Sequence, residues 1–123
     1  MSKTWPLSTI LVTGSALRDR DTFVVGLQHQ GYVVLEAHSE TEAVEIARLH
    51  SRPIHIMLID GDVCGRSLSA KLSRYRTSMT TLFINWSTTE NEHDTLAPHL
   101  VPRKIREILE PGRADLKLHA GAA

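Results

Sequence analysis

Four short apolar runs, separated by segments of helical periodicity, constrain the fold of this chain more than any other feature. The runs cover residues 8–13, 32–37, 54–60 and 80–86, with the sequences STILVT, YVVLEA, IHIMLID and TTLFINW. Their aliphatic and β-branched residues follow one another without polar alternation, which is typical of parallel strands covered on both faces. Helical patterns lie between the runs and after the last one, over residues 16–30, 39–50, 68–75 and 101–110. This alternation predicts an α/β fold in which helices cover both faces of a parallel sheet.

Local signals predict several helix ends. Ser39 and Glu42 form an S-x-x-E capping box before the second helix, and Gly31 stands where a glycine ends the first. Pro102 suits the first turn of the last helix. The side chains expected to face the core are Phe23, Val24 and Leu27, then Ala43, Ile46 and Ala47, then Leu68, Leu72 and Tyr75, and finally Val101, Ile105, Ile108 and Leu109.

Length and composition indicate one ordinary globular domain. The chain has 123 residues with 14 basic and 14 acidic side chains, so the net charge is zero, and it lacks the basic footprint of a nucleic-acid binder. A single cysteine, Cys64, and the absence of a long apolar segment lead us to expect a cytoplasmic protein with no membrane contact. We assign residues 1–110 to the domain and expect residues 111–123, which have no usable periodicity, to be a disordered tail.

The polar residues that follow the predicted strands are the candidates for a functional site, because ligands of parallel α/β sheets bind at the carboxyl ends of the strands. They are Gly14, Ser15, Asp60, Gly61, Asp62, Asn85 and Trp86. The seven histidines are scattered, with no spacing typical of metal ligands.

The stretch ILVTGS resembles the opening of short-chain dehydrogenases, where glycines let the backbone approach a pyrophosphate. Arg18 and Arg20 occupy the second and third glycine positions of that motif, and no Tyr-x-x-x-Lys pair follows. These residues argue against a nucleotide site.

A wider resemblance covers residues 8–110. The segment QGYVVLEAHSETEAVEIARLHSRPIHIMLID is similar to receiver domains of two-component response regulators from their second strand to their phosphoacceptor aspartate, and RKIREILE resembles their closing helix. The resemblance implies a flavodoxin-like doubly wound sheet of order 2-1-3-4. The usual fourth helix and fifth strand would be shortened or missing, because only residues 87–100 separate the fourth run from the last helix.

The resemblance also implies a changed phosphorylation pocket. Asp60 takes the place of the phosphoacceptor, whereas Gly14 and Ser15 replace the acidic pair that holds Mg²⁺. The pocket Ser or Thr falls at Asn85 or Trp86, and Asp94 stands at the position of the family lysine. Asp62 adds a carboxylate two residues after Asp60.

The loss of the fifth strand would leave the fourth strand at the edge of the sheet. Leu82, Phe83, Ile84 and Trp86 are therefore candidate interface residues, and we expect a homodimer across this edge. The alternative is cover by the chain's own last helix together with the segment TLAPHL, residues 95–100.

The leading hypothesis is a stand-alone pseudo-receiver that signals by protein–protein contact, without catalysis, cofactor or metal. The alternative is a phosphorelay response regulator in which a histidine kinase still phosphorylates Asp60, with Mg²⁺ held weakly by Asp60 and Asp62.

Overall fold

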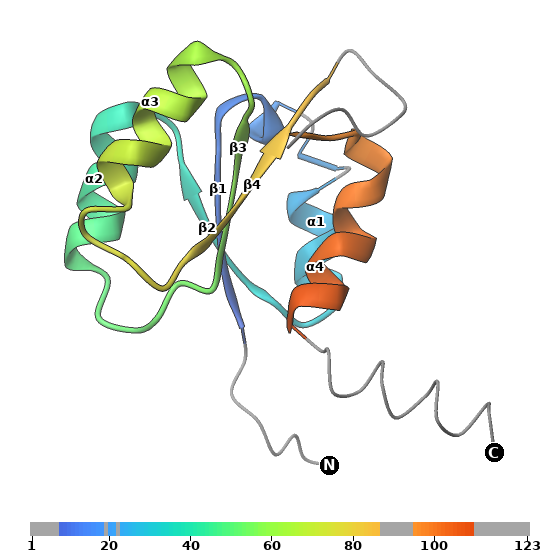
Figure 1. Cartoon of the computed structure of the whole chain (residues 1–123). Helices are drawn as coiled ribbons and strands as arrows, with labels where there is room; N and C mark the ends of the chain where they lie inside the picture. Colours follow the sequence, from blue (N-terminus) through green and yellow to red (C-terminus); the bar gives the residue numbers. More distant parts are fainter. Residues whose placement is uncertain (1–7, 19, 22, 87–94, 110–123) are drawn as a thin grey trace, which may run out of the picture.

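The computed structural model describes residues 8–18, 20–21, 23–86 and 95–109. Strands and helices alternate along these residues (Figure 1). The strands are β1 (Thr9–Thr13), β2 (Val33–Ala37), β3 (Ile56–Asp60), β4 (Thr80–Ile84) and β5 (Thr95–Leu96), and the helices are α1 (Val24–His29), α2 (Glu40–Leu49), α3 (Val63–Leu72) and α4 (Val101–Leu109). Two 3₁₀ turns, Gly14–Leu17 and Pro98–Leu100, follow β1 and precede α4.

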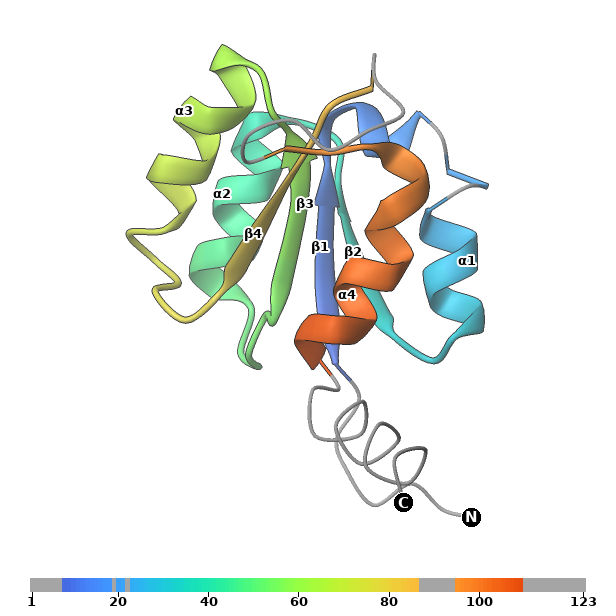
Figure 2. The same ribbon diagram turned by 45° about the vertical axis from the view of Figure 1, so that its right-hand side comes forward.

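The five strands form one parallel sheet of order β2-β1-β3-β4-β5. Helices α2 and α3 cover one face, and α1 and α4 cover the other (Figures 1 and 2). This confirms the predicted flavodoxin-like fold with a shortened fifth strand, because β5 has two residues. Residues 87–94, in which the usual fourth helix was expected to be shortened or missing, lie outside the described residues, as does the predicted tail, residues 111–123.

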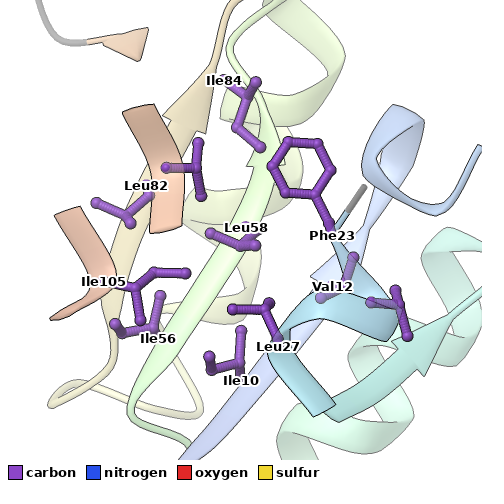
Figure 3. Close-up of a cluster of buried hydrophobic side chains, with 11 residues drawn as sticks. Ile10, Val12, Phe23, Leu27, Ile56, Leu58, Leu82, Ile84 and Ile105 are labelled. Carbon is purple, nitrogen blue, oxygen red and sulfur yellow. The ribbon is translucent and has the colours of Figure 1, made fainter. Parts of the chain in front are cut away.

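Two apolar clusters hold the helical layers on the sheet. On the α1/α4 face, Phe23, Leu27 and Ile105 pack on side chains of β1, β3 and β4 (Figure 3). On the α2/α3 face, Ala43, Ala47 and Leu72 pack on Leu11, Met57 and Ile59. Burial of each large aliphatic side chain stabilises the fold by about 1.5–3 kcal/mol, so the strand runs and helix stripes together determine the architecture.

The first helix is shorter than the sequence predicts. The 3₁₀ turn and the exposed residues Arg18, Arg20 and Asp21 replace the amino-terminal half of the helix expected over residues 16–30. The predicted stripe of Phe23, Val24 and Leu27 is nevertheless buried. A segment of exposed charged residues has no apolar side chain to bury on the sheet, so packing favours the helix only from Val24 onward.

The third helix ends at Leu72, so Tyr75 is not part of its buried stripe and is 46% exposed. The guanidinium of Arg76 explains why the chain leaves the helical path after Leu72. It donates to the carbonyl oxygens of Ala47 (2.7 Å) and His50 at the carboxyl end of α2, and of Arg52 (2.8 Å) in the loop that follows. The segment after α3 is thereby tied to α2, and Tyr75 faces solvent.

Both predicted caps are present. Gly31, at φ +96°, follows α1 in a Schellman arrangement, in which the Tyr32 N–H donates to the Leu27 carbonyl and the Gly31 N–H to that of Gln28. Ser39 Oγ accepts from the Glu42 N–H at 3.1 Å. The reciprocal bond differs from the prediction, because the Glu42 carboxylate accepts from the His38 N–H at 2.7 Å, one residue before the cap.

No helix in the described part of the chain is long and apolar enough to cross a bilayer.

Candidate functional site

Asp60 lies at the centre of the carboxyl edge of the sheet. It is the last residue of β3, it pairs in register with Ile84 of β4, and it is half-buried. It lines two cavities at this edge. The larger, about 420 Å³, lies toward β1 and β2, and the smaller, about 300 Å³, lies toward β4 and β5. The larger cavity is at the point where the strand order reverses, which is where flavodoxin-like sheets bind ligands.

Gly14 lies directly against the carboxylate of Asp60. A Cβ at this position would stand 2.9 Å from Asp60 Oδ2 and 3.1 Å from its Cγ, closer than ordinary van der Waals contact. Gly14 also has φ +76°, a left-handed conformation that side chains with a Cβ disfavour. The Asp60 carboxylate therefore fills the space into which a side chain at position 14 would extend.

Trp86 holds the same carboxylate from the other side. Its indole Nε1–H donates to Asp60 Oδ1 at 2.8 Å, and its ring meets that of Phe23 edge to face at 5.3 Å between centroids. Because Phe23, the residue before α1, is almost completely buried in the α1/α4 cluster, this contact connects the carboxylate to that cluster. A hydrogen bond to a carboxylate contributes about 1.5–3 kcal/mol when it is shielded from water, and less at a half-buried site.

Asp62 caps α3. Its Oδ1 accepts from the Gly65 N–H at 2.7 Å, so this carboxylate satisfies a free backbone donor of the helix. The helix begins very close to the strand end, since a Cβ on Gly65 would stand 1.9 Å from the Asp60 carbonyl oxygen. The short loop after Asp60 is compatible with this approach because residue 65 is glycine.

β5 and Arg66 cover the side of the site that is formed by the carboxyl end of β4. The Asn85 N–H donates to the Leu96 carbonyl at 2.9 Å, and Thr95 packs so closely on Gly61 that a Cβ there would stand 2.7 Å from Thr95 Cγ2. The Arg66 guanidinium lies 4.4 Å from the centroid of the Phe83 ring, and its Nε donates to the Gly61 carbonyl at 3.0 Å. These contacts shield the carboxyl end of β4 from solvent.

Glu42 lies on α2, two residues after Glu40, which lines the larger cavity. Its carboxylate is held in the ionised form. The His38 backbone N–H and, to a smaller extent, the His38 ring donate to its carboxylate, and these bonds lower the pKa of Glu42 below its ordinary value of 4.5.

The residues around Asp60 offer few ligands for a Mg²⁺ ion. Such sites use one or two carboxylates with waters in a near-octahedral arrangement. Gly14 supplies no carboxylate, a side chain at its position would have to displace the Asp60 carboxylate, and Asp62 Oδ1 is engaged as a helix cap. Among the described residues, no group of three or more His, Cys, Asp or Glu side chains is arranged to hold a metal.

The structure places Asp60 and Asp62 beside Gly14 at the larger cavity and beside Asn85 and Trp86 at the smaller one. The backbone of Ser15 lies in the 3₁₀ turn after β1, and Asp94 lies outside the described residues.

The interface prediction needs correction. Leu82 and Ile84 are 7% and 1% exposed, because their side chains pack in the α1/α4 cluster, so they are not available to another chain. Phe83 is half-buried under Arg66, and Trp86 is half-buried against Phe23. The exposed edge of β4 is also shorter than predicted, since β5 pairs with the carboxyl end of β4.

Sequence reasoning missed three contributors to the site, namely the indole donor of Trp86, the cover supplied by Thr95 and the placement of Arg66 over Phe83. The glycine at position 61 was a weak signal of close packing. None of the three has a sequence spacing that points to its partner.

The fold and the site together define a flavodoxin-like domain with a single half-buried aspartate at the centre of the carboxyl edge. Among solved structures, the chain is similar to a response regulator protein from Burkholderia pseudomallei with a phosphorylated aspartic acid, a calcium ion and citrate. The TM-score is 0.63 at 20% sequence identity, over 92% of this chain and 72% of that one. No protein-family model matches the chain, and no curated protein matches it. The similarity establishes the receiver-type fold.

Proposed function

We propose that this protein is an atypical receiver domain that acts in cytoplasmic signal transduction by binding other proteins, without catalysis and without Mg²⁺-dependent phosphorylation. The receiver-type fold supports the signalling role. The neutral net charge argues against nucleic acid as the partner.

The packing of Asp60 against Gly14 carries this proposal. In a phosphorylatable receiver, a cation offsets the repulsion between the carboxylate nucleophile and the anionic phosphoryl donor. Here the nucleophile itself occupies the position of the missing acidic side chain, and its other oxygen accepts from Trp86. The carboxylate is thus held by a neutral donor rather than beside a metal site.

The test is an NMR titration of ¹⁵N-labelled protein with Mg²⁺ and then with beryllofluoride, which mimics an aspartyl phosphate. We expect no saturable shifts in the amides of Gly14, Asp60 and Asn85 at millimolar metal. The control is Asp60→Asn, which removes the anion and keeps the size of the side chain. Saturable shifts that disappear in Asp60→Asn would establish the alternative, a response regulator phosphorylated on Asp60 by a histidine kinase.

A homodimer through β4 belongs to the same proposal, at a revised position. The Thr80 N–H donates to the carbonyl oxygen of His55, the residue before β3, and the Asn85 N–H donates to that of Leu96 in β5. Because peptide groups alternate in direction along a parallel strand, the N–H of Thr81 points to the outer edge, beyond the two residues that β5 covers.

Thr81→Pro removes this outward donor without disturbing the bonds to β3. We expect light scattering to show a dimer for the native chain and a monomer for Thr81→Pro. A monomeric native chain, or a dimer that tolerates the proline, would show that the β4 edge is not the interface.

A further inference from the structure

An open apolar groove runs between β2 and α2 at the other edge of the sheet. The groove, about 330 Å³, is lined by Leu35, Glu42, Glu45, Ile46, Leu49 and His50, and we call it the β2–α2 groove. Leu49 is 68% exposed, and Val33, which shares the strand face of Leu35, is 38% exposed. Exposed large apolar side chains are uncommon in the described part of the chain, where the others are Val63 and Tyr75. Two of the four therefore lie at this one edge.

The strand beside the groove is the end of the sheet. Within the described residues, β2 pairs with β1 and with no other strand. The Val33 N–H donates to Ser8 on the β1 side, so the peptide groups of Val34 and Glu36 point to the outer edge. Apolar side chains next to an exposed strand edge are typical of surfaces that bind another polypeptide.

The rim of the groove is acidic. Glu42 and Glu45 flank its apolar floor, and the bonds from His38 keep the Glu42 carboxylate ionised. The nearest basic residue of the α2 sequence, Arg48, is exposed and is not part of the groove lining. The groove therefore combines an aliphatic floor with local negative charge.

We propose that the β2–α2 groove binds a segment of another protein that presents aliphatic side chains flanked by lysine or arginine. The aliphatic side chains would cover Leu35, Ile46 and Leu49, and the basic ones would pair with Glu42 and Glu45. Charge complementarity selects such a partner over a second copy of this chain, since a symmetric pairing would bring the same carboxylates together across the interface. The inference rests on the proposed role in protein contacts and does not depend on the state of Asp60.

The experiment uses two synthetic peptides of equal length and leucine content, one with lysine and one with glutamate at every polar position. Each is titrated into the ¹⁵N-labelled full chain. We expect the lysine peptide to shift the amides of Leu35, Ile46 and Leu49 saturably, with a dissociation constant on the order of 0.1–1 mM, as suits a small groove. The glutamate peptide should bind at least about fivefold more weakly, and salt should reduce this difference.

Two variants at exposed positions test the assignment without disturbing the core. Leu49→Ser and Glu45→Lys should each weaken binding of the lysine peptide about fivefold or more. Val63→Ser removes an apolar side chain that is 84% exposed on α3 and serves as the matched control, with unchanged affinity expected.

Equal binding of both peptides, shifts outside the groove, or native affinity in Leu49→Ser would overturn the inference. Groove amides that move with protein concentration in the absence of peptide would instead identify a second copy as the occupant. A beryllofluoride response at Asp60 would overturn the proposed function while leaving the groove result unaffected, so the two failures are distinguishable.

Discussion

Replacement of Gly14 by alanine tests the contact on which the proposed function rests. The substitution has two separable costs. Alanine at φ +76° is destabilised by about 1–2 kcal/mol because of its left-handed backbone. Its Cβ would also stand 2.9 Å from Asp60 Oδ2, so the carboxylate must move away from the indole N–H of Trp86.

The second cost is small, because a half-buried carboxylate regains water when it moves. We take it as about 1 kcal/mol, below the range of about 1.5–3 kcal/mol for shielded hydrogen bonds to charged groups. The total is then about 2–3 kcal/mol, which for a domain of this size lowers Tm by about 10 °C.

A double-mutant cycle with Asp60→Ala separates the two terms, measured by urea unfolding followed by circular dichroism. In the Asp60→Ala background Gly14→Ala should lose only the backbone term, leaving a coupling free energy of about 1 kcal/mol. Equal costs in the two backgrounds would refute the packing of Asp60 against Gly14. If Gly14→Ala has no cost at all, the left-handed conformation is wrong as well.

Two further substitutions test the site and its surroundings. Gly65→Ala should destabilise the domain by more than about 3 kcal/mol in urea unfolding, because its Cβ would meet the Asp60 carbonyl oxygen at 1.9 Å. The matched change Gly26→Ala, in an open helical position, should instead stabilise by about 0.5–1 kcal/mol, and similar effects at both positions would contradict the close approach of α3. For Glu42, whose folded pKa is lowered by bonds from His38, the stabilising contribution is fully present above the ordinary pKa of 4.5 and is lost as pH falls through the folded value. Glu42→Gln should therefore lose less stability than the native chain between about pH 7 and pH 3, and parallel urea midpoints for the two proteins would show that these bonds contribute nothing.

The architecture follows from patterns that act over short stretches of chain. Uninterrupted apolar runs indicate strands buried on both faces, and alternation with helices requires parallel crossovers. The Ser39 cap and Gly31 were predictable for the same reason, since each acts on backbone groups within a few residues. The length of α1 was not, because a helical pattern does not say where packing against the sheet begins.

The position of Asp60 at the carboxyl edge was also determined by the sequence, because the last residue of a buried parallel strand ends at that edge. The absence of acidic residues at positions 14 and 15 could likewise be seen there. Only the tertiary structure decided which groups occupy the space of the missing acidic side chains. Asp60 packs on Gly14 and accepts from Trp86, and Thr95 covers Gly61. These contacts join residues that are distant along the chain, and their distances depend on how the sheet and its loops pack, which no local pattern encodes.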